Sequence, residues 1–202
     1  MGRRSDHTRA ELEALIVDEG HRQMEEVGFA RFSAREVAKR IGYSIGTLYN
    51  VFGSHDRLIL AINARTVRLW TLHLAAALDA SGPDRLECLM RGYFAFAHAH
   101  PRSWAAVYDH RLVAGSDMPS WYTEALGELT GLVDAEVARA LPDATPAQAR
   151  ALGRSLLAVV HGHCELAING TFARLGEADP LTAAIARVRE AMAAAAAAAG
   201  AR

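Results

Sequence analysis

A short run of uncharged residues near the N-terminal end carries the groups best suited to chemistry. Its sequence, IGYSIGTLYNVF from Ile41 to Phe52, contains hydroxyl groups, an amide and bare glycine backbone, but no Lys, Arg, Asp or Glu. Hydroxyl, amide and backbone N–H groups bind the phosphate oxygens and base edges of a duplex. The run therefore indicates recognition of a nucleic-acid groove.

Two histidine pairs, His98 with His100 and His161 with His163, raise the possibility of a metal site. Residues two apart on a helix point about 200° away from each other, so neither pair chelates one ion. No Ser-His-Asp order, glycine-rich phosphate loop or pair of catalytic carboxylates stands out. We therefore expect no catalytic residue, no metal and no cofactor.

The local charge also favours a polyanionic partner. The formal net charge is -1, yet residues 10–29 carry six acids and one Arg, whereas residues 31–57 carry five bases and two acids. Arg3, Arg4 and Arg9 add a basic arm. A nearly neutral protein with one basic end binds a polyanion by that end.

Length and composition indicate a globular protein. The chain has 202 residues, 51% of them hydrophobic, which is enough for a sizeable core. It contains no long apolar stretch for a membrane span, and its first residues do not resemble a signal peptide. Cys88 and Cys164 lack C-x-x-C spacing, so reduced thiols are expected. These features predict a cytoplasmic protein without a membrane segment.

The elements that position the polar run are helices. Apolar residues recur at helical spacing nearly throughout and no alternating strand pattern occurs, so we predict an all-α fold of about nine helices. Capping boxes at Thr8 and Ser33, and Ser44 as a cap whose hydroxyl accepts from the amide of Gly46 or Thr47, mark three helix starts. Pro101, Pro119, Pro146 and Pro180 are expected at first helical positions. The predicted helices span residues 8–28, 33–42, 44–52, 54–80, 83–99, 101–113, 119–140, 146–171 and 180–199.

The second and third predicted helices fit a helix-turn-helix. Such a pair needs a small residue at the contact, a residue tolerant of positive φ at the turn and apolar anchors on the second helix. Ala38 is the small residue, Gly42 the turn residue, and Leu48 and Val51 the anchors. The alternative is a surface helical hairpin, which would need neither the basic flank nor the polar face. We place a domain boundary before Ser54, giving domains 1–53 and 54–202.

The span from Thr8 to about Ile62, above all GFARFSAREVAKRIGYSIGTLYNVFGSHDRLI, resembles the DNA-binding domain of the TetR family of bacterial transcriptional regulators. The resemblance implies a three-helix DNA-binding domain followed by a helical domain that binds a small molecule and dimerises through its last two long helices. It places Thr47 and Tyr49 on the DNA backbone and Ser33 at a phosphate-facing helix start. It places Arg35, Ser44, Ile45, Gly46 and Asn50 at or near bases. His55 stands where a phosphate-contacting Lys is usual, and Tyr43 where a small aliphatic residue is usual.

The second domain offers candidates for an effector pocket, which is expected to be apolar with a few polar groups aimed inward. The candidates are Phe94, His98, Trp104, Tyr108, Trp121, His161, Cys164 and Glu165. Plain core packing is the alternative for each of these residues except Glu165. Glu165 needs a partner such as Arg154, Arg174 or a cationic effector, unless it faces solvent or the dimer partner. Val160-His161-Gly162 resembles the His-Gly core of a TetR subgroup named for a Trp-His-Gly motif, with Leu157 in place of the Trp.

These features together predict a homodimeric DNA-binding regulator, more specifically a repressor. It would bind a near-palindromic double-stranded operator and leave it when a small apolar or aromatic effector enters the second domain. The alternative is an all-α ligand-binding or protein-interaction module that no longer binds DNA.

Overall fold

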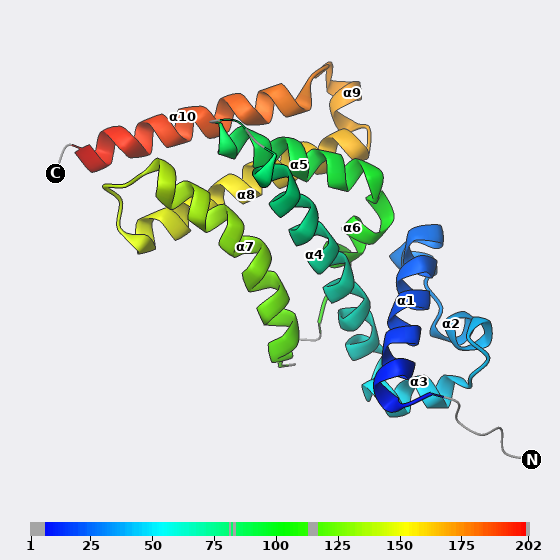
Figure 1. Cartoon of the computed structure of the whole chain (residues 1–202). Helices are drawn as coiled ribbons and strands as arrows, with labels where there is room; N and C mark the ends of the chain where they lie inside the picture. The colour runs from blue at the N-terminus through cyan, green and yellow to red at the C-terminus, as the bar shows by residue number, and fades with distance from the viewer. Residues whose placement is uncertain (1–6, 81, 83, 113–116, 201–202) are drawn as a thin grey trace, which may run out of the picture. The chain divides into compact units, whose positions relative to one another are not determined.

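The computed structural model of the chain (Figure 1) describes residues 7–80, 82, 84–112 and 117–200. Within these residues the chain forms ten α-helices, nine of them of seven residues or more, together with one 3-10 turn and no strand. The all-α prediction is therefore confirmed. The elements are α1 (Arg9–Val27), η1 (Phe29–Arg31), α2 (Ala34–Arg40), α3 (Ile45–Phe52), α4 (His55–Asp79), α5 (Arg85–Ala99), α6 (Pro101–Asp109), α7 (Ser120–Ala140), α8 (Pro146–Ile168), α9 (Thr171–Leu175) and α10 (Pro180–Gly200).

The chain packs into two compact units. Unit 1 contains the residues up to Leu69 together with His100–Leu126, and unit 2 contains Trp70–Ala99 and the residues from Gly127 onward. The long helices α4 and α7 each contribute residues to both units. This division follows packing alone, and the functional boundary before Ser54 stays a prediction.

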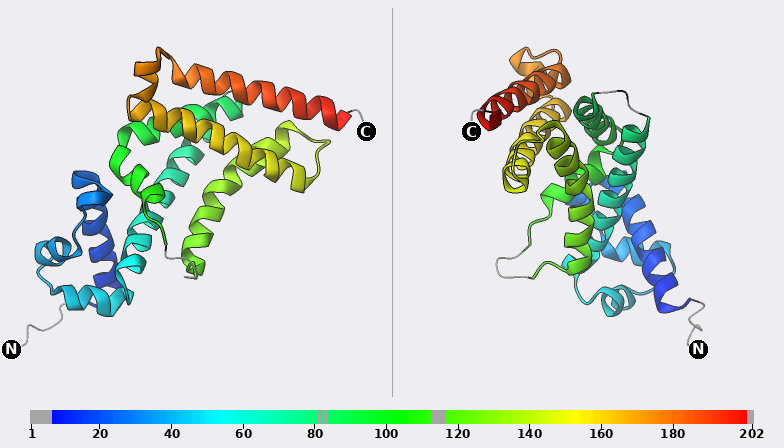
Figure 2. Two further views of the ribbon diagram at one scale, coloured as in Figure 1. Left: turned by 180° about the vertical axis from the view of Figure 1, so that it is seen from behind. Right: turned by 60° about the vertical axis from the view of Figure 1, so that its left-hand side comes forward.

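An apolar core shared by α1, α2, α3, α4 and α6 holds unit 1 together. In Figures 1 and 2, α2 and α3 lie beside α1, and the three helices contact one another. Gly20 marks a close approach between α1 and α4, because a Cβ atom at this position would lie 2.5 Å from Cδ1 of Ile62. The fully buried side chains of this core are Ile16, Met24, Val37, Leu48, Leu58, Ile59, Ile62 and Ala106.

Helices α8 and α10 run side by side in unit 2, and both pack against α5 (Figure 2). The prediction of one helix over residues 146–171 was wrong, since α8 ends at Ile168 and the separate α9 follows. Gly170 adopts a left-handed conformation with φ of 74°, which interrupts the helix, and Gly176 with φ of 80° ends α9.

Other helix limits differ slightly from the predicted ones. Helix α7 begins at Ser120, one residue after Pro119, and α6 ends at Asp109 rather than at residue 113. The predicted limits 83 and 113, and the basic residues Arg3 and Arg4, lie outside the described residues. Pro101, Pro146 and Pro180 occupy first helical positions as predicted. Across the described ranges, no helix is both long and apolar enough for a membrane span.

Candidate nucleic-acid interface and ligand cavities

The turn between α2 and α3 has the geometry that its residue types predict. Gly42 adopts φ of 76°, a conformation that residues with a side chain rarely adopt. The amide of Tyr43 donates to the carbonyl of Ala38 at 2.9 Å. Ala38 is 2% exposed and Leu48 is fully buried, so a small residue and an apolar anchor hold α3 against α2. The helix-turn-helix prediction is confirmed.

The start of α3 is capped by Ser44, again as predicted. Its Oγ atom accepts from the amide of Thr47 at 3.1 Å and lies 2.9 Å from Oγ1 of Thr47. The first amides of a helix have no intrahelical acceptor, so the N–H groups of Ile45 and Gly46 are available to an anion. This end of α3 therefore presents two linked hydroxyl groups and two backbone donors.

The rest of α3 separates an apolar face from a polar one. Leu48 is fully buried and Phe52 is 9% exposed, whereas Gly46 and Asn50 are exposed and Tyr49 is half-buried. None of the nine predicted DNA contacts is buried. The individual roles of these nine residues stay predictions. The nine are Ser33, Arg35, Ser44, Ile45, Gly46, Thr47, Tyr49, Asn50 and His55.

The start of α2 differs from the predicted capping box. Ser33 Oγ accepts from the amide of Glu36 at 3.3 Å, as expected for the first half of that motif. The amide of Ser33, however, donates to Oε1 of the buried Gln23 at 2.8 Å, and the carboxylate of Glu36 accepts from Arg40. The amide of Ser33 is therefore bonded to a side chain of α1 instead of to Glu36, and this bond fixes the start of α2 to α1.

The acids of α1 neutralise one of the basic residues of α2. Arg40 lies 3.2 Å from Glu19, 2.7 Å from Glu26 and 3.3 Å from Glu36, and these hydrogen bonds raise the pKa of the Arg40 guanidinium. Arg40 therefore ties α2 to α1 and adds little to the basic surface. By contrast, Arg35 is exposed and has no ion-pair partner among the residues that the structure describes.

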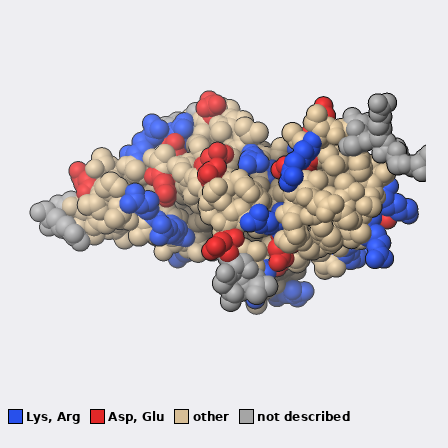
Figure 3. Space-filling view, turned by 90° about the horizontal axis from the view of Figure 1, so that it is seen from below, with Lys and Arg blue, Asp and Glu red and all other residues tan. Residues whose placement is uncertain are grey.

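Lys and Arg atoms gather along the right-hand edge of the face seen from below in Figure 3. From the helix-turn-helix segment, the exposed basic side chains are Arg31, Arg35, Lys39 and Arg57, besides the paired Arg40. The local positive charge expected from the sequence is thus carried by solvent-accessible side chains.

The two departures from the usual family pattern both have structural contexts. The hydroxyl of Tyr43 lies 2.8 Å from Nδ1 of His7, so the polar group that requires a partner has one. His55 is exposed at the first position of α4, with its ring edge-on to that of Phe32 at a centroid distance of 6.2 Å. The position of His55 leaves its imidazole accessible to a phosphate group.

The eight candidate effector contacts fall in both units. Unit 2 contains Phe94, His98, His161, Cys164 and Glu165, and unit 1 contains Trp104, Tyr108 and Trp121. Trp104 is fully buried and stacks edge-on with Tyr108 at 5.4 Å, which is a core arrangement. All eight assignments as ligand contacts stay predictions.

Three of the candidates on α8 have defined surroundings. The hydroxyl of Tyr93 lies 2.9 Å from Nδ1 of His161, and burial lowers the pKa of this imidazole. Burial also raises the pKa of the Cys164 thiol to about 12, so the sulfur stays protonated at neutral pH. Glu165 accepts from the side-chain amide of Asn169 at 3.4 Å. His161 and Glu165 therefore each have a hydrogen-bonding partner within unit 2.

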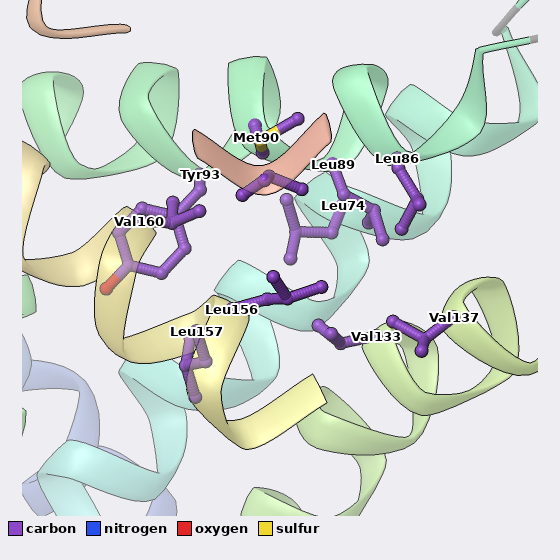
Figure 4. Close-up of a pocket in the computed structure, with 11 residues that line it drawn as sticks. Leu74, Leu86, Leu89, Met90, Tyr93, Val133, Val137, Leu156, Leu157 and Val160 are labelled. Carbon is purple, nitrogen blue, oxygen red and sulfur yellow. The ribbon is translucent and has the colours of Figure 1, made fainter. Parts of the chain in front are cut away.

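Two cavities of unit 2 are candidates for an effector site. The first has a volume of about 50 Å³ and is lined by apolar side chains from α4, α5, α7, α8 and α10 (Figure 4). The second is more open, has a volume of about 610 Å³ and is lined in part by Phe94 and His98. The first cavity contains none of the eight candidates. Its lining residues are Leu74, Leu86, Leu89, Met90, Tyr93, Val133, Val137, Leu156, Leu157, Val160 and Val188.

A three-helix unit with an exposed polar recognition helix, followed by further helices, defines a helix-turn-helix regulator. Residues 16–62 match a family model described as bacterial regulatory proteins of the tetR family. Residues 86–192, more than half of the chain, match the tetracyclin repressor-like C-terminal domain. The chain therefore belongs to the TetR family of transcriptional regulators. The Trp-His-Gly subgroup assignment is not tested by these matches and stays a prediction.

Individual relatives agree with this family. The HTH-type transcriptional regulator Rv1816 of Mycobacterium tuberculosis is 29% identical over 126 residues, which are 60% of this chain and 51% of that protein. The regulator Mb1846 of Mycobacterium bovis matches equally. The chain spans about half the length of these curated relatives.

Solved structures share the fold. A Rhodococcus sp. RHA1 protein of unknown function has a TM-score of 0.72 at 22% identity, over 96% of this chain and 98% of that one. A tetR-family transcriptional regulator from Streptomyces coelicolor has a TM-score of 0.68 at 20% identity, over 98% of this chain and 84% of that one. At this level of identity, these likenesses concern the fold alone.

Proposed function

We propose that this chain is a homodimeric repressor that binds a near-palindromic operator through α2, α3 and the start of α4, and that a small apolar or aromatic ligand releases it. The observation that carries the proposal is the two-sided character of α3. Leu48 and Phe52 fix one face in the core, and the other face presents hydroxyl, amide and backbone groups without a charge. Such a surface suits a groove better than bulk solvent.

Fluorescence anisotropy with labelled duplex from the DNA upstream of the coding sequence tests this binding. Arg35→Ala and Tyr49→Phe remove a predicted base contact and a predicted backbone contact, and each is expected to weaken binding by about tenfold. Arg174→Gln removes an equal charge from the exposed surface of α9, away from α3 in the sequence and outside the face of α8 considered below, and is the matched control. Affinity should also fall steeply with salt. Wild-type affinity in both variants would refute the contact assignment, and no binding by wild type would favour a module without DNA affinity.

A homodimer would place two copies of α3 at successive positions along one face of a duplex. The exposed side of α8 supports an interface between two copies, because Ala147, Ala151 and Ala158 share a helical face there. A Cβ atom at Gly162, one turn further, would meet nothing within 4 Å, which leaves room for a second helix. Ala158→Glu is expected to yield monomers by light scattering. An unchanged mass would exclude this face as the interface.

The apolar cavity of about 50 Å³ is the proposed effector site. Small-molecule sites usually measure about 300–1,000 Å³, so an effector must enlarge the cavity as it binds. Leu74, which lines the cavity, lies on α4, a single helix that begins at His55. A ligand that favours an arrangement of α4 unsuited to DNA weakens operator affinity by linkage.

A panel of small aromatic compounds, tested for release of the labelled duplex, examines this regulation. The enlarged side chain in Leu156→Phe occupies the cavity, and the variant should keep operator binding but lose the response. A response that persists in this variant would place the effector elsewhere.

A further inference from the structure

Unit 1 contains a separate cavity that the proposed regulation does not use. Its volume is about 360 Å³, within the range of small-molecule sites, and its walls come from α1, α3, α4 and the first turn of α7. Val17 of α1 and Phe52 of α3 provide apolar surface, and the half-buried indole of Trp121 adds a flat aromatic wall. A ligand in this cavity would contact the last turn of α3 directly.

Two arginines, Arg57 and Arg68, line this cavity. Neither Arg57 nor Arg68 has a carboxylate within ion-pair distance in the part of the chain that the structure describes. Arg65, between them on α4, is paired with Asp18 at 2.6 Å, so unpaired arginines are not a general property of this helix. Glu13 is the one acid among the lining residues that the structure describes, and it forms no ion pair with either arginine. The cavity therefore holds an excess of positive charge.

The positions of the two arginines indicate what kind of anion fits. They are eleven residues apart, which is about 16 Å along a helix axis, and Ala61 lies on the same side between them. The two backbone positions thus lie toward opposite ends of an apolar stretch, so a ligand with one carboxylate can be held at either end. Guanidinium groups bind carboxylates through paired hydrogen bonds, and flat apolar groups pack on indole rings.

We infer that this cavity binds an organic carboxylate with an apolar body, whose carboxylate is held by Arg57 or Arg68 and whose apolar part lies against Phe52 and Trp121. The glutamate in the wall disfavours highly charged polyanions, because like charges repel in a partly enclosed site. A small organic acid therefore fits better than a polyphosphate.

Calorimetric titration of the full chain with 4-phenylbutyrate, in the absence of DNA, tests this site. The neutral 4-phenylbutyramide has the same apolar body and is the paired probe. We expect the carboxylate to bind at least about tenfold more tightly than the amide, since charged hydrogen bonds are stronger than neutral ones. Because Trp70 and Trp104 are 1% and 0% exposed, a change in tryptophan emission on binding should come from Trp121.

The double variant Arg57→Gln/Arg68→Gln is expected to lose the preference for the carboxylate, and Trp121→Ala is expected to weaken binding about tenfold. The control Arg111→Gln/Arg174→Gln removes the same charge from two exposed positions that do not line the cavity and should bind like wild type. Thermal melting of each variant verifies folding.

Equal binding of acid and amide, or an undiminished preference in the double arginine variant, would overturn this inference. If the wild-type chain binds no carboxylate and the double arginine variant binds duplex DNA more weakly than wild type, the two arginines would instead be assigned to DNA phosphates. Since binding is measured without DNA, failure here leaves the proposed operator binding untouched.

Discussion

The hydroxyl oxygen of Ser44 lies 2.9 Å from that of Thr47 and also accepts the Thr47 amide at 3.1 Å. One side chain therefore caps α3 and orients a hydroxyl that is predicted to contact DNA. Thr47→Val keeps the branched shape but removes the hydroxyl, so operator affinity should fall by about tenfold with little change in melting temperature. Anisotropy and thermal melting measure the two quantities.

Two further variants complete this comparison. Thr47→Ser retains the hydroxyl and should keep most of the affinity. Ser44→Ala loses the cap as well and should also reduce the free energy of unfolding by about 1 kcal/mol. Full affinity in Thr47→Val would show that the hydroxyl does not contact DNA.

A substitution at Gly46 should change operator affinity without lowering the stability of the fold. A Cβ atom there would have one near neighbour, Ser44 Oγ at 3.6 Å, so the folded chain accommodates it. Gly46→Ala should leave stability equal or raise it by up to about 1 kcal/mol, because Ala favours the helix. Operator affinity should nevertheless drop, since a methyl group would stand between the α3 backbone and the duplex. Unchanged affinity would mean that the backbone does not approach DNA at Gly46.

The crossing of α1 and α4 predicts a different outcome for Gly20. Its substitution by Ala would place Cβ 2.5 Å from Cδ1 and 2.9 Å from Cγ1 of Ile62. We expect Gly20→Ala to lower the free energy of unfolding by about 1–3 kcal/mol, measured by urea denaturation. Adding Ile62→Val removes Cδ1 and should recover part of this loss. Strictly additive effects of the two substitutions would contradict the contact.

The half-buried imidazole of His161 gives the free energy of unfolding a pH dependence. Burial lowers its pKa in the folded chain below the unfolded value of about 6.5, so the unfolded state binds the proton first on acidification. The contribution of neutral His161 to the free energy of unfolding is therefore fully present above about pH 6.5, and it is lost as the pH falls through the unfolded-state pKa toward the folded-state pKa. His161→Gln retains a side chain able to bond with Tyr93 but does not titrate. Its melting temperature should fall less than that of wild type between about pH 7.5 and 5; parallel profiles would disprove this role.

Local signals made much of the fold predictable. Thr8 and Ser44 cap helices because their hydroxyl groups accept the amides three residues onward, and Gly42 adopts the positive φ that the turn requires. The same kind of signal, Asn169-Gly170, lies within the predicted helix 146–171, and glycine after a helical run commonly ends the helix. The break before α9 was therefore present in the sequence.

Other features depend on residues far apart in the chain. The side chain of Gln23 accepts from the amide of Ser33, which in a capping box would donate to Glu36. The acids of α1 likewise neutralise Arg40. The apolar cavity combines side chains from five helices, none of which carries a distinguishing pattern of its own. A single sequence contains no record of such pairings, so periodicity and spacing did not reveal them.

The small size of the apolar cavity also sets how sensitive the regulator would be. If an effector fits only an enlarged form, its apparent dissociation constant equals the intrinsic one divided by the fraction of molecules already enlarged. A form populated at about one in a hundred raises the required dose about a hundredfold. A smaller side chain at position 156 would favour the enlarged form before the effector binds. It should therefore lower the effector concentration needed for release without changing any residue that is predicted to contact DNA.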